Sequence, residues 1–396
     1  MTQSKLILPV IVISQFCCTS LWFAGNGVIS DLVINFNLRD TALGHLTAAV
    51  QIGFIVGTLS FAILTIADRI SPSKVFFVCA VIGALFNLGI IYEGNSLTSL
   101  LLLRFLTGFF LAGIYPVGMK IAADYYKKGL GKSLGILVGA LVFGTAFPHL
   151  LNNITETLSW KSVLITTSSI AVFGGVLMWT LVPNGPYRKA GKRLNLLAFS
   201  QVFRNPEFRS SAFGYFGHMW ELYAFWAFVP IMLKNYYAKH PQVDFNISLW
   251  SFIIIAVGGL ACVLAGYLSQ KLGTKRTAFL SLLFSFSCCL MSPLIFSVES
   301  DLIFLAFLLF WGMVVIADSP LFSTLVAQNA PDEIKGTALT IVNCIGFSIT
   351  IVSIQLINGL QTYTDSNSIY SILALGPLLG LISLRKNNKM QAAINN

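Results

Sequence analysis

Apolar residues form long runs along this chain, and short polar segments separate them. Each run is about 20 residues long, the length that an α-helix needs to cross a hydrocarbon core about 30 Å thick. The pattern therefore predicts an all-α polytopic membrane protein with twelve transmembrane helices. We place the spans at residues 6–30, 43–66, 75–92, 98–120, 133–154, 162–182, 210–235, 247–269, 277–297, 302–325, 336–358 and 367–384.

Composition supports this prediction. The chain is 56% hydrophobic and only 10% charged, whereas soluble domains contain about 25% charged residues. A water-soluble globular domain is therefore excluded. The first apolar run follows Lys5 and shows no small-residue cleavage site, so we interpret it as a span and not as a removed signal peptide. All seven cysteines lie in apolar runs, which favours buried thiols over a disulfide framework.

The distribution of basic residues predicts the orientation. With the N-terminus in the cytoplasm, the cytoplasmic segments hold 20 Lys and Arg residues and the opposite segments hold four. This bias obeys the positive-inside rule. We expect a multi-pass protein of the plasma (inner) membrane with both termini cytoplasmic. The bias also explains the net charge of +10 without a nucleic-acid partner.

The longest interruption, 183–209, divides the chain into two sets of six spans. We predict two pseudo-symmetric six-helix bundles, 1–182 and 210–396, joined by a cytoplasmic linker at 183–209. The apolar stretch 194–199 within the linker is either a short interfacial helix or a plain connector.

The two halves share landmarks at nearly constant offsets of 202 to 205 residues, as expected for an internal repeat. Such repeats are typical of carriers whose substrate site lies between the halves. The paired landmarks are Asp68 and Gln270, Gly108 and Gly312, Pro116 and Pro320, and Gly131 and Gly336.

Several short motifs resemble those of the major facilitator superfamily of secondary transporters, in the right order and over essentially the full chain. The family's loop motif is nearly complete from Gly266 to Arg276, with Gln270 replacing its acid. In the first half Asp68, Arg69 and Lys74 match. The remaining matches are Arg104 with Gly108, Gly113 and Pro116 in the fourth span, and the pair Trp160-Lys161 before the sixth.

The chain departs from this family's patterns at some positions. Leu64, Ser71 and Ser73 stand where the loop motif has Gly, Gly and a basic residue. In the fifth span Gly135 and Gly144 keep the spacing of an exporter motif, but Pro148-His149 stands where Gly-Pro is expected. This argues against a drug/proton antiporter, which stays an alternative.

The resemblance implies a cytoplasmic gate. In the family, an acid just past the fourth span holds the loop motif, so we predict a bond between Arg69 and Asp124. The alternative is a pair of solvated charges that contribute little. The predicted gate residues are Asp68, Arg69, Asp124, Gln270 and Lys271.

Four charged or titratable residues stand out at membrane depth: Arg104, His218, Glu221 and Asp318. A charge there costs about 2.5–3.5 kcal/mol or more, so it normally faces a cavity or a partner. The resemblance implies that spans one, four, seven and ten, which carry these residues or their counterparts, line a central cavity. We predict a proton-coupling role for all four.

His218 and Glu221 are three residues apart, so they share one face of the seventh span. One interpretation is that Glu221 carries the coupling proton or binds a cationic group, with His218 as its partner. The other is a hydrogen-bonded pair that only packs helices.

Arg104 and Asp318 each allow several roles. Arg104 binds an anionic substrate, pairs with Glu221, or braces the bundle against backbone carbonyls. Pro320 is predicted to break or bend the tenth span beside Asp318. The carboxylate there either binds a cation or proton, or caps the broken helix.

The first span carries a polar and aromatic stripe at Gln15, Cys18, Trp22 and Asn26 in an otherwise apolar helix. The stripe is either a cavity wall or a row of interhelix hydrogen bonds. His149 and Asn152 are lower-ranked candidates. The full predicted substrate cavity is Gln15, Cys18, Trp22, Asn26, Gln51, Tyr215, Trp311 and Asn343.

The leading hypothesis is a secondary transporter that moves a small organic solute by alternating access with proton coupling. Its partners are the solute, protons and the lipid bilayer, and we expect a monomer without cofactor or metal. The chain lacks a Gly-x-x-x-x-Gly-Lys-Ser/Thr phosphate loop. The alternatives are a drug or metabolite exporter and a transition-metal carrier using Cys17, Cys18, His218 and Met219. An enzyme or sensor is disfavoured.

Overall fold

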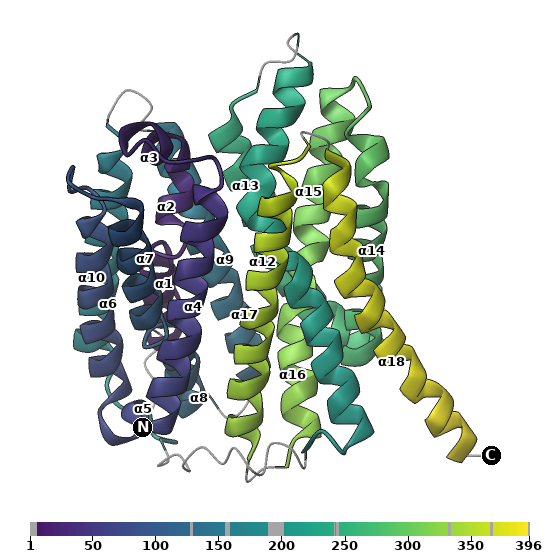
Figure 1. The fold of residues 1–396 in the computed structure, drawn as a ribbon. Helices are drawn as coiled ribbons and strands as arrows, with labels where there is room; N and C mark the ends of the chain where they lie inside the picture. The colour runs from purple at the N-terminus through teal and green to yellow at the C-terminus, as the bar shows by residue number, and fades with distance from the viewer. Residues whose placement is uncertain are drawn as a thin grey trace. The chain divides into compact units, whose positions relative to one another are not determined.

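The structure is a computed structural model that describes residues 6–126, 130–154, 159–188, 202–240, 242, 245–331, 334–364 and 367–394 (Figure 1). Within these ranges every regular element is a helix, and there is no strand. The helices up to residue 181 are α1 (Ile7–Thr19), α2 (Ala24–Gly27), α3 (Ile29–Asn35), α4 (Ala42–Ile63), α5 (Ile66–Arg69), α6 (Pro72–Gly89), α7 (Leu97–Leu111), α8 (Tyr115–Tyr125), α9 (Leu130–Ile154) and α10 (Lys161–Leu181).

The later helices are α12 (Pro206–Lys239), α13 (Ile247–Leu272), α14 (Thr274–Ile295), α15 (Asp301–Ala317), α16 (Ser319–Asn329), α17 (Lys335–Leu360), the 3₁₀ helix η1 (Asn367–Ala374) and α18 (Leu375–Ile394). Within the described residues, ten helical segments are long and apolar enough to cross a membrane. The predicted all-α polytopic fold is therefore confirmed.

Two predicted spans fall outside those ten segments for identifiable reasons. The first is broken, because α1 ends at Thr19 after only 13 residues and the chain continues as the short helices α2 and α3. The seventh is α12, which is 34 residues long but carries His218, Glu221 and several Tyr and Trp residues. The polarity that makes this helix a candidate for function also lowers its hydropathy.

The chain forms two compact units. Unit 1 comprises Met1–Arg193 and Asn246–Gly259, and unit 2 comprises Leu194–Phe245 and Leu260–Asn396. The division into bundles at 182 and 210 stays a prediction. Much of the predicted linker, 189–201, lies outside the described residues, and so does the interfacial helix predicted at 194–199.

Glycines set the closest helix contact of unit 1, between α4 and α7. A Cβ atom at Gly53 would overlap the carbonyl oxygen of Phe105, and one at Gly108 would overlap that of Val50. Small residues at such positions let two helix backbones approach, which is a main source of helix association in membranes. Gly108, which belongs to the fourth-span motif, is thus required for packing.

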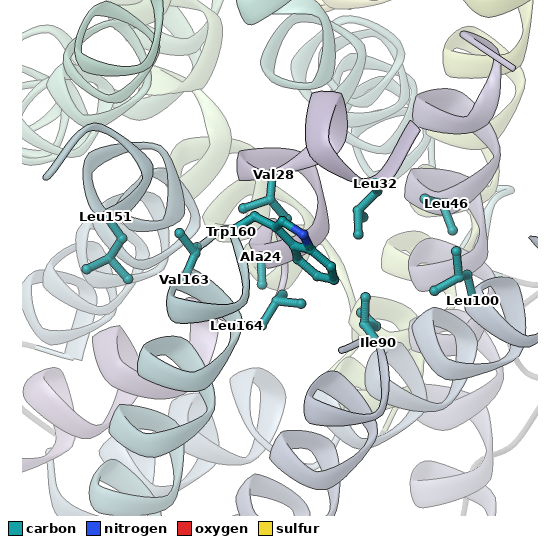
Figure 2. Packing of buried hydrophobic residues seen from close by; sticks show 10 residues of the cluster. All are labelled: Ala24, Val28, Leu32, Leu46, Ile90, Leu100, Leu151, Trp160, Val163 and Leu164. Atoms are coloured by element: carbon teal, nitrogen blue, oxygen red, sulfur yellow. The ribbon is translucent and has the colours of Figure 1, made fainter. Parts of the chain in front are cut away.

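An apolar cluster joins the ends of several unit 1 helices around Trp160 (Figure 2). Next to it, Lys161 Nζ lies 2.7 Å from Glu93 Oε1 and joins the start of α10 to the loop after α6. The hydrogen bond from Lys161, together with its charge, lowers the pKa of Glu93. The cluster consists of Ala24, Val28, Leu32, Leu46, Ile90, Leu100, Leu151, Trp160, Val163 and Leu164.

In unit 2, α12 packs against α17 and α18. A Cβ at Gly217 would overlap the carbonyl oxygen of Gly376, so α12 and α18 also meet backbone to backbone. Tyr236 of α12 stacks on Phe304 of α15 with ring centroids 3.8 Å apart. These contacts hold α12 along much of its length, and α12 carries the candidate site.

The repeat predicted from the sequence reappears in two broken helices. Segment α7–α8 runs from Leu97 to Tyr125, and segment α15–α16 runs from Asp301 to Asn329, each bound lying 204 positions after its counterpart. In both, a serine caps the start and the second piece opens with a proline at its first turn. A proline removes one backbone N–H and fits best in a first turn, which fixes each break.

We expect Gly108→Ala to lower the stability of the protein by about 1–3 kcal/mol, because overpacking forces α4 and α7 apart. Thermal unfolding in detergent measures this as a lower Tm. Gly135→Ala is the matched control, since a Cβ there meets nothing within 4 Å. Equal melting temperatures for the two variants would contradict the proposed role of the close contact.

Candidate functional site

Helix α12 presents two titratable side chains to the interior of unit 2. His218 and Glu221 are each 1% exposed and lie three residues apart on α12. Their partners lie on α14, on α15 and at the junction between α15 and α16. The two side chains have different partners, so they form two adjoining arrangements rather than one pair.

Three neutral groups donate to the same oxygen of Glu221. Ser285 Oγ and Cys289 Sγ of α14 lie 2.5 Å and 3.2 Å from Oε1, and Trp311 Nε1 of α15 lies 2.5 Å from it. Ser285 and Cys289 are four residues apart, so they share one helix face. Neither residue is among those predicted from the sequence, although two polar side chains four residues apart in an apolar helix are a usable signal.

This arrangement allows Glu221 to exist with or without a proton. A carboxylate oxygen accepts hydrogen bonds, and so does the carbonyl oxygen of a protonated carboxyl group. Because all three donors bind Oε1, a proton can sit on Oε2 without displacing any of them. The site therefore tolerates both charge states with the same set of contacts.

His218 pairs with Asp318, whereas the sequence predicts Glu221 as its partner. Its Nδ1 lies 2.7 Å from Asp318 Oδ1, the distance of a charge-assisted hydrogen bond, and both side chains are 1% exposed. Residues i and i+3 on a helix point to one face, but their tips diverge when neighbouring helices offer better partners. Here Trp311 of α15 supplies an indole to Glu221, and Asp318, directly after α15, supplies a carboxylate to His218.

Asp318 lies at the predicted helix break, which is confirmed. Helix α15 ends at Ala317 and α16 begins at Ser319, with Asp318 between them. Pro320 has no N–H to donate to the carbonyl of Ile316, and Cys262 Sγ of α13 reaches that carbonyl at 3.4 Å instead. The break thus places a carboxylate in the interior while its freed carbonyl keeps a donor.

Two atoms of this pair have no hydrogen-bond partner within the described residues: His218 Nε2 and Asp318 Oδ2. Buried polar atoms are usually satisfied, so unpaired ones point to water, an ion or a ligand. Aromatic rings surround the imidazole, with the ring centroid of Tyr215 at 6.0 Å and that of Phe322 at 6.2 Å. Tyr215 and Trp311, two predicted cavity residues, therefore lie at the candidate site.

Arg104 is in unit 1 and is used as a brace, the third of the roles considered for it. Its side chain is 1% exposed, Nη1 donates to the Leu21 carbonyl at 3.0 Å, and Nη2 donates to the Trp22 carbonyl. These carbonyls follow the end of α1, where the helix dipole favours a cation. Arg104 therefore satisfies the break in the first span.

Comparison with known proteins places this fold. The family model of the Major Facilitator Superfamily matches residues 11–354. The chain belongs to this superfamily. Among solved structures, it is similar to the nucleoside transporter NupG, with a TM-score of 0.73, 15% identity and coverage of 97% of this chain and 99% of that one.

Further similar structures include the proton:xylose symporter XylE, with a TM-score of 0.70, 16% identity and coverage of 96% and 94%. A bacterial homologue of the lysosomal transporter Spinster has a TM-score of 0.64, 16% identity and the same coverage. At these identities the similarity shows the fold alone. Members of the superfamily have twelve helices in two bundles, which agrees with the predicted class.

Two curated relatives match parts of the chain. NiaP of Bacillus subtilis (strain 168), provisionally described as a niacin/nicotinamide transporter, is 26% identical over 164 residues, or 40% of this chain and 39% of that protein. AraJ of Escherichia coli (strain K12), provisionally described as a transporter, is 24% identical over 285 residues, or 68% and 66%. Both alignments span less than two thirds of the relative.

The polar stripe predicted in the first span does not lie on one helix face. Cys18 Sγ donates to the carbonyl of Ala171 on α10 at 3.2 Å, and Asn26 Nδ2 donates to Thr47 Oγ1 on α4 at 2.8 Å. The Trp22 ring lies 4.7 Å from that of Phe54. Because the helix breaks after Thr19, the regular spacing assumed for the stripe fails. Interhelix hydrogen bonding accounts for Cys18 and Asn26.

Two glutamines of unit 1 are fully buried, and their amide atoms have no hydrogen-bond partner within the described residues: Gln15 on α1 and Gln51 on α4. Gln51 lies between Thr47 and Phe54 on the α4 face that contacts the first span. Both glutamines remain candidates for binding a solute or water.

The lower-ranked candidates behave differently from one another. His149 of α9 is buried, and its Nε2 is unpaired in the described part of the chain. Asn152 donates to Ser248 Oγ at 3.1 Å, so its amide has a structural use. Asn343 of α17 is partly exposed.

The predicted bond between Arg69 and Asp124 is not formed. Asp68 pairs instead with Lys120 of α8 at 2.8 Å, and Arg69 Nε donates to Thr65 Oγ1 at 3.1 Å. Successive residues of a helix point about 100° apart, so Arg69 cannot face α8 when Asp68 does.

The second-half loop motif begins in α13. Gln270 and Lys271, predicted as gate residues, are exposed in its last turn. The ion pair beside them joins Lys275 to Glu207 at 3.2 Å. The glycine of this motif, Gly273, has φ +86°, a conformation that residues with a side chain rarely adopt.

We expect Arg104→Gln to destabilise the protein by about 1.5–3 kcal/mol, because it removes hydrogen bonds from a charged group to two carbonyls. Arg104→Lys should be intermediate, since an ammonium lacks the guanidinium fork. Thermal unfolding in detergent measures both. If both variants melted at the temperature of the unmodified protein while solute affinity fell, Arg104 would be a solute ligand and not a brace.

Proposed function

We propose that this chain is a secondary active transporter that moves a small organic solute across a membrane by alternating access, coupled to protons. Membership of the superfamily and the polytopic helical fold support transport. Alternating access requires two units that move about a site, and the chain forms two compact units.

The observation that carries the proton coupling is the environment of Glu221. Its donors are a hydroxyl, a thiol and an indole, and none of them carries a charge that would fix the carboxylate in the ionised form. A charged group in a membrane interior is costly, so proton uptake removes a cost while the three contacts are kept. A group that gains and loses a proton in this way suits a coupling site.

The His218–Asp318 pair is the second proton-binding element. A proton on Nδ1 is held between a ring nitrogen and a carboxylate 2.7 Å away. Adding a proton to His218 or to Asp318 changes this short contact, and Asp318 lies at the break between α15 and α16. Protonation here thus acts on the junction of two helices, where a change of angle costs least.

The remaining features of the proposal follow from the sequence and the family. The chain lies in the plasma (inner) membrane with both termini in the cytoplasm and works as a monomer. Unpaired amides at Gln15 and Gln51 favour a solute that both donates and accepts hydrogen bonds. Niacin, nicotinamide, nucleosides and xylose are the first solutes to test, since similar proteins are named for them.

The test uses purified protein in liposomes with an imposed pH gradient. Coupling free energies are typically about 1–3 kcal/mol, or about 5–150-fold, and we expect Glu221→Gln to lose gradient-driven accumulation by a factor in that range. Exchange of labelled for unlabelled solute without a gradient should persist, because it needs no net proton movement.

Glu207→Gln is the matched control, since it is the same substitution on the same helix at a partly exposed surface pair. It should accumulate solute as the unmodified protein does. Accumulation by Glu221→Gln equal to that of Glu207→Gln would show that Glu221 is not the coupling group. If the unmodified protein carried no solute in either assay, the transport function itself would be wrong.

A further inference from the structure

The first residues after α10, 182–188, are firmly attached to unit 1, although the sequence predicts a connector there. We call them the tether segment. Ser73 Oγ donates to the Val182 carbonyl at 2.6 Å, and Tyr125 Oη donates to the Pro183 carbonyl at 2.6 Å. Ser71 Oγ donates to Asn184 Oδ1 at 2.9 Å. These bonds reach the start of α6 and the end of α8.

The end of the tether segment makes further contacts with the same two places. Tyr187 N donates to the Asp124 carbonyl at 3.0 Å, and Gly185 packs so closely on Asp124 that a Cβ atom there would overlap its carbonyl oxygen. Arg188 Nη2 donates to the carbonyls of Asp68 and Ile70, each at 2.9 Å. The segment thus bridges the α5–α6 turn and the end of α8.

These contacts explain why the loop motif departs from the family pattern. Ser71 and Ser73, which stand in place of a glycine and a basic residue, are the two motif residues that donate to the tether segment. A long basic side chain at 73 would not fit there, because Ser73 is only 3% exposed. Arg188 brings a basic group to the same turn from the tether segment.

Arg188 acts on the gate through Asp68. The backbone carbonyl of Asp68 accepts from Arg188, while its side chain pairs with Lys120 of α8 at 2.8 Å. Both carbonyls that Arg188 binds lie at the end of α5, where a cation is favoured by the orientation of the peptide dipoles. Holding this backbone fixes the direction in which the Asp68 carboxylate points.

We propose that the tether segment is a fixed part of unit 1, and that Arg188 is a positioning residue that orients Asp68 toward Lys120 during transport. The effect on transport rests on the proposed function, whereas the attachment of the segment does not.

Hydrogen–deuterium exchange of the detergent-solubilised protein tests the attachment. Loss of hydrogen bonds of ordinary strength speeds local opening by about 2- to 12-fold, and we expect exchange of the 182–188 backbone to accelerate by such a factor in Arg188→Gln. Arg188→Lys should restore part of the protection. Arg209→Gln, an exposed basic residue of α12, is the control and should leave exchange unchanged. Exchange in Arg188→Gln as slow as in the control overturns the proposal.

Solute flux in liposomes tests the positioning role. Arg188→Gln should lower the maximal rate with KM unchanged, because Arg188 contacts the α5–α6 turn that carries Asp68. Arg188→Lys should recover part of the rate. A rate equal to that of Arg209→Gln overturns the positioning role even if exchange is altered. Absence of flux in the unmodified protein overturns the proposed function, while the exchange result still decides the attachment.

A crosslink provides a second arm that does not depend on losing a contact. Ser71→Cys with Asn184→Cys, joined by a short thiol-reactive reagent, should preserve transport if the segment stays on unit 1 throughout the cycle. The seven native cysteines are buried, which favours reaction at the introduced pair. Transport that stops on crosslinking and returns when a cleavable reagent is reduced would show that the segment must detach, and would overturn the proposal.

Discussion

A carboxyl group in the interior of a membrane protein must be satisfied by the protein itself, and Glu221 meets this constraint with three neutral donors on one oxygen. Helices α12, α14 and α15 must lie in a fixed register for those donors to converge. The glycine contact between α12 and α18 and the stacked pair of Tyr236 and Phe304 keep α12 in that register. The packing of unit 2 thus holds the three donors around Glu221, and the hydrogen bonds to Glu221 in turn join α12 to α14 and α15.

The same constraint explains the broken helices. A break releases carbonyls that lipid cannot satisfy, and the breaks after α1 and after α15 each have a side-chain donor for them. Arg104 donates to the carbonyls after α1, and Cys262 donates to the carbonyl that Pro320 leaves free. The break between α15 and α16 also leaves Asp318 beside His218, so unit 2 contains a buried titratable pair at a helix junction. In unit 1 the buried Arg104 braces the structure, and the side-chain amides of Gln15 and Gln51 have no hydrogen-bond partner within the described residues.

The sequence predicts more of the fold than of the candidate site. Hydropathy located the spans, and Pro320 located a break, because both are local properties. The break in the first span has no proline to signal it. The sequence therefore predicts one continuous helix face from Gln15 to Asn26, and the structure contains no such face. The sequence does not predict the partners of Glu221. Periodicity shows which residues share one helix face, but it does not show how the neighbouring helices are rotated about their own axes. The predicted Arg69–Asp124 bond is replaced by Asp68–Lys120 for the same reason, since the contact lies one residue earlier on α5 and four residues earlier on α8.

In the proposed mechanism Glu221 binds and releases a proton while its three donors stay in place. Infrared difference spectroscopy of the protein in lipid, with the pH stepped up and down, measures this most directly. We expect a protonated-carboxyl band that appears and disappears reversibly, is lost in Glu221→Gln and persists in Glu207→Gln. The band should also shift in Ser285→Ala, because one hydrogen bond to the carboxyl is removed. An unchanged band in Glu221→Gln would show that Glu221 is not the group that takes up the proton.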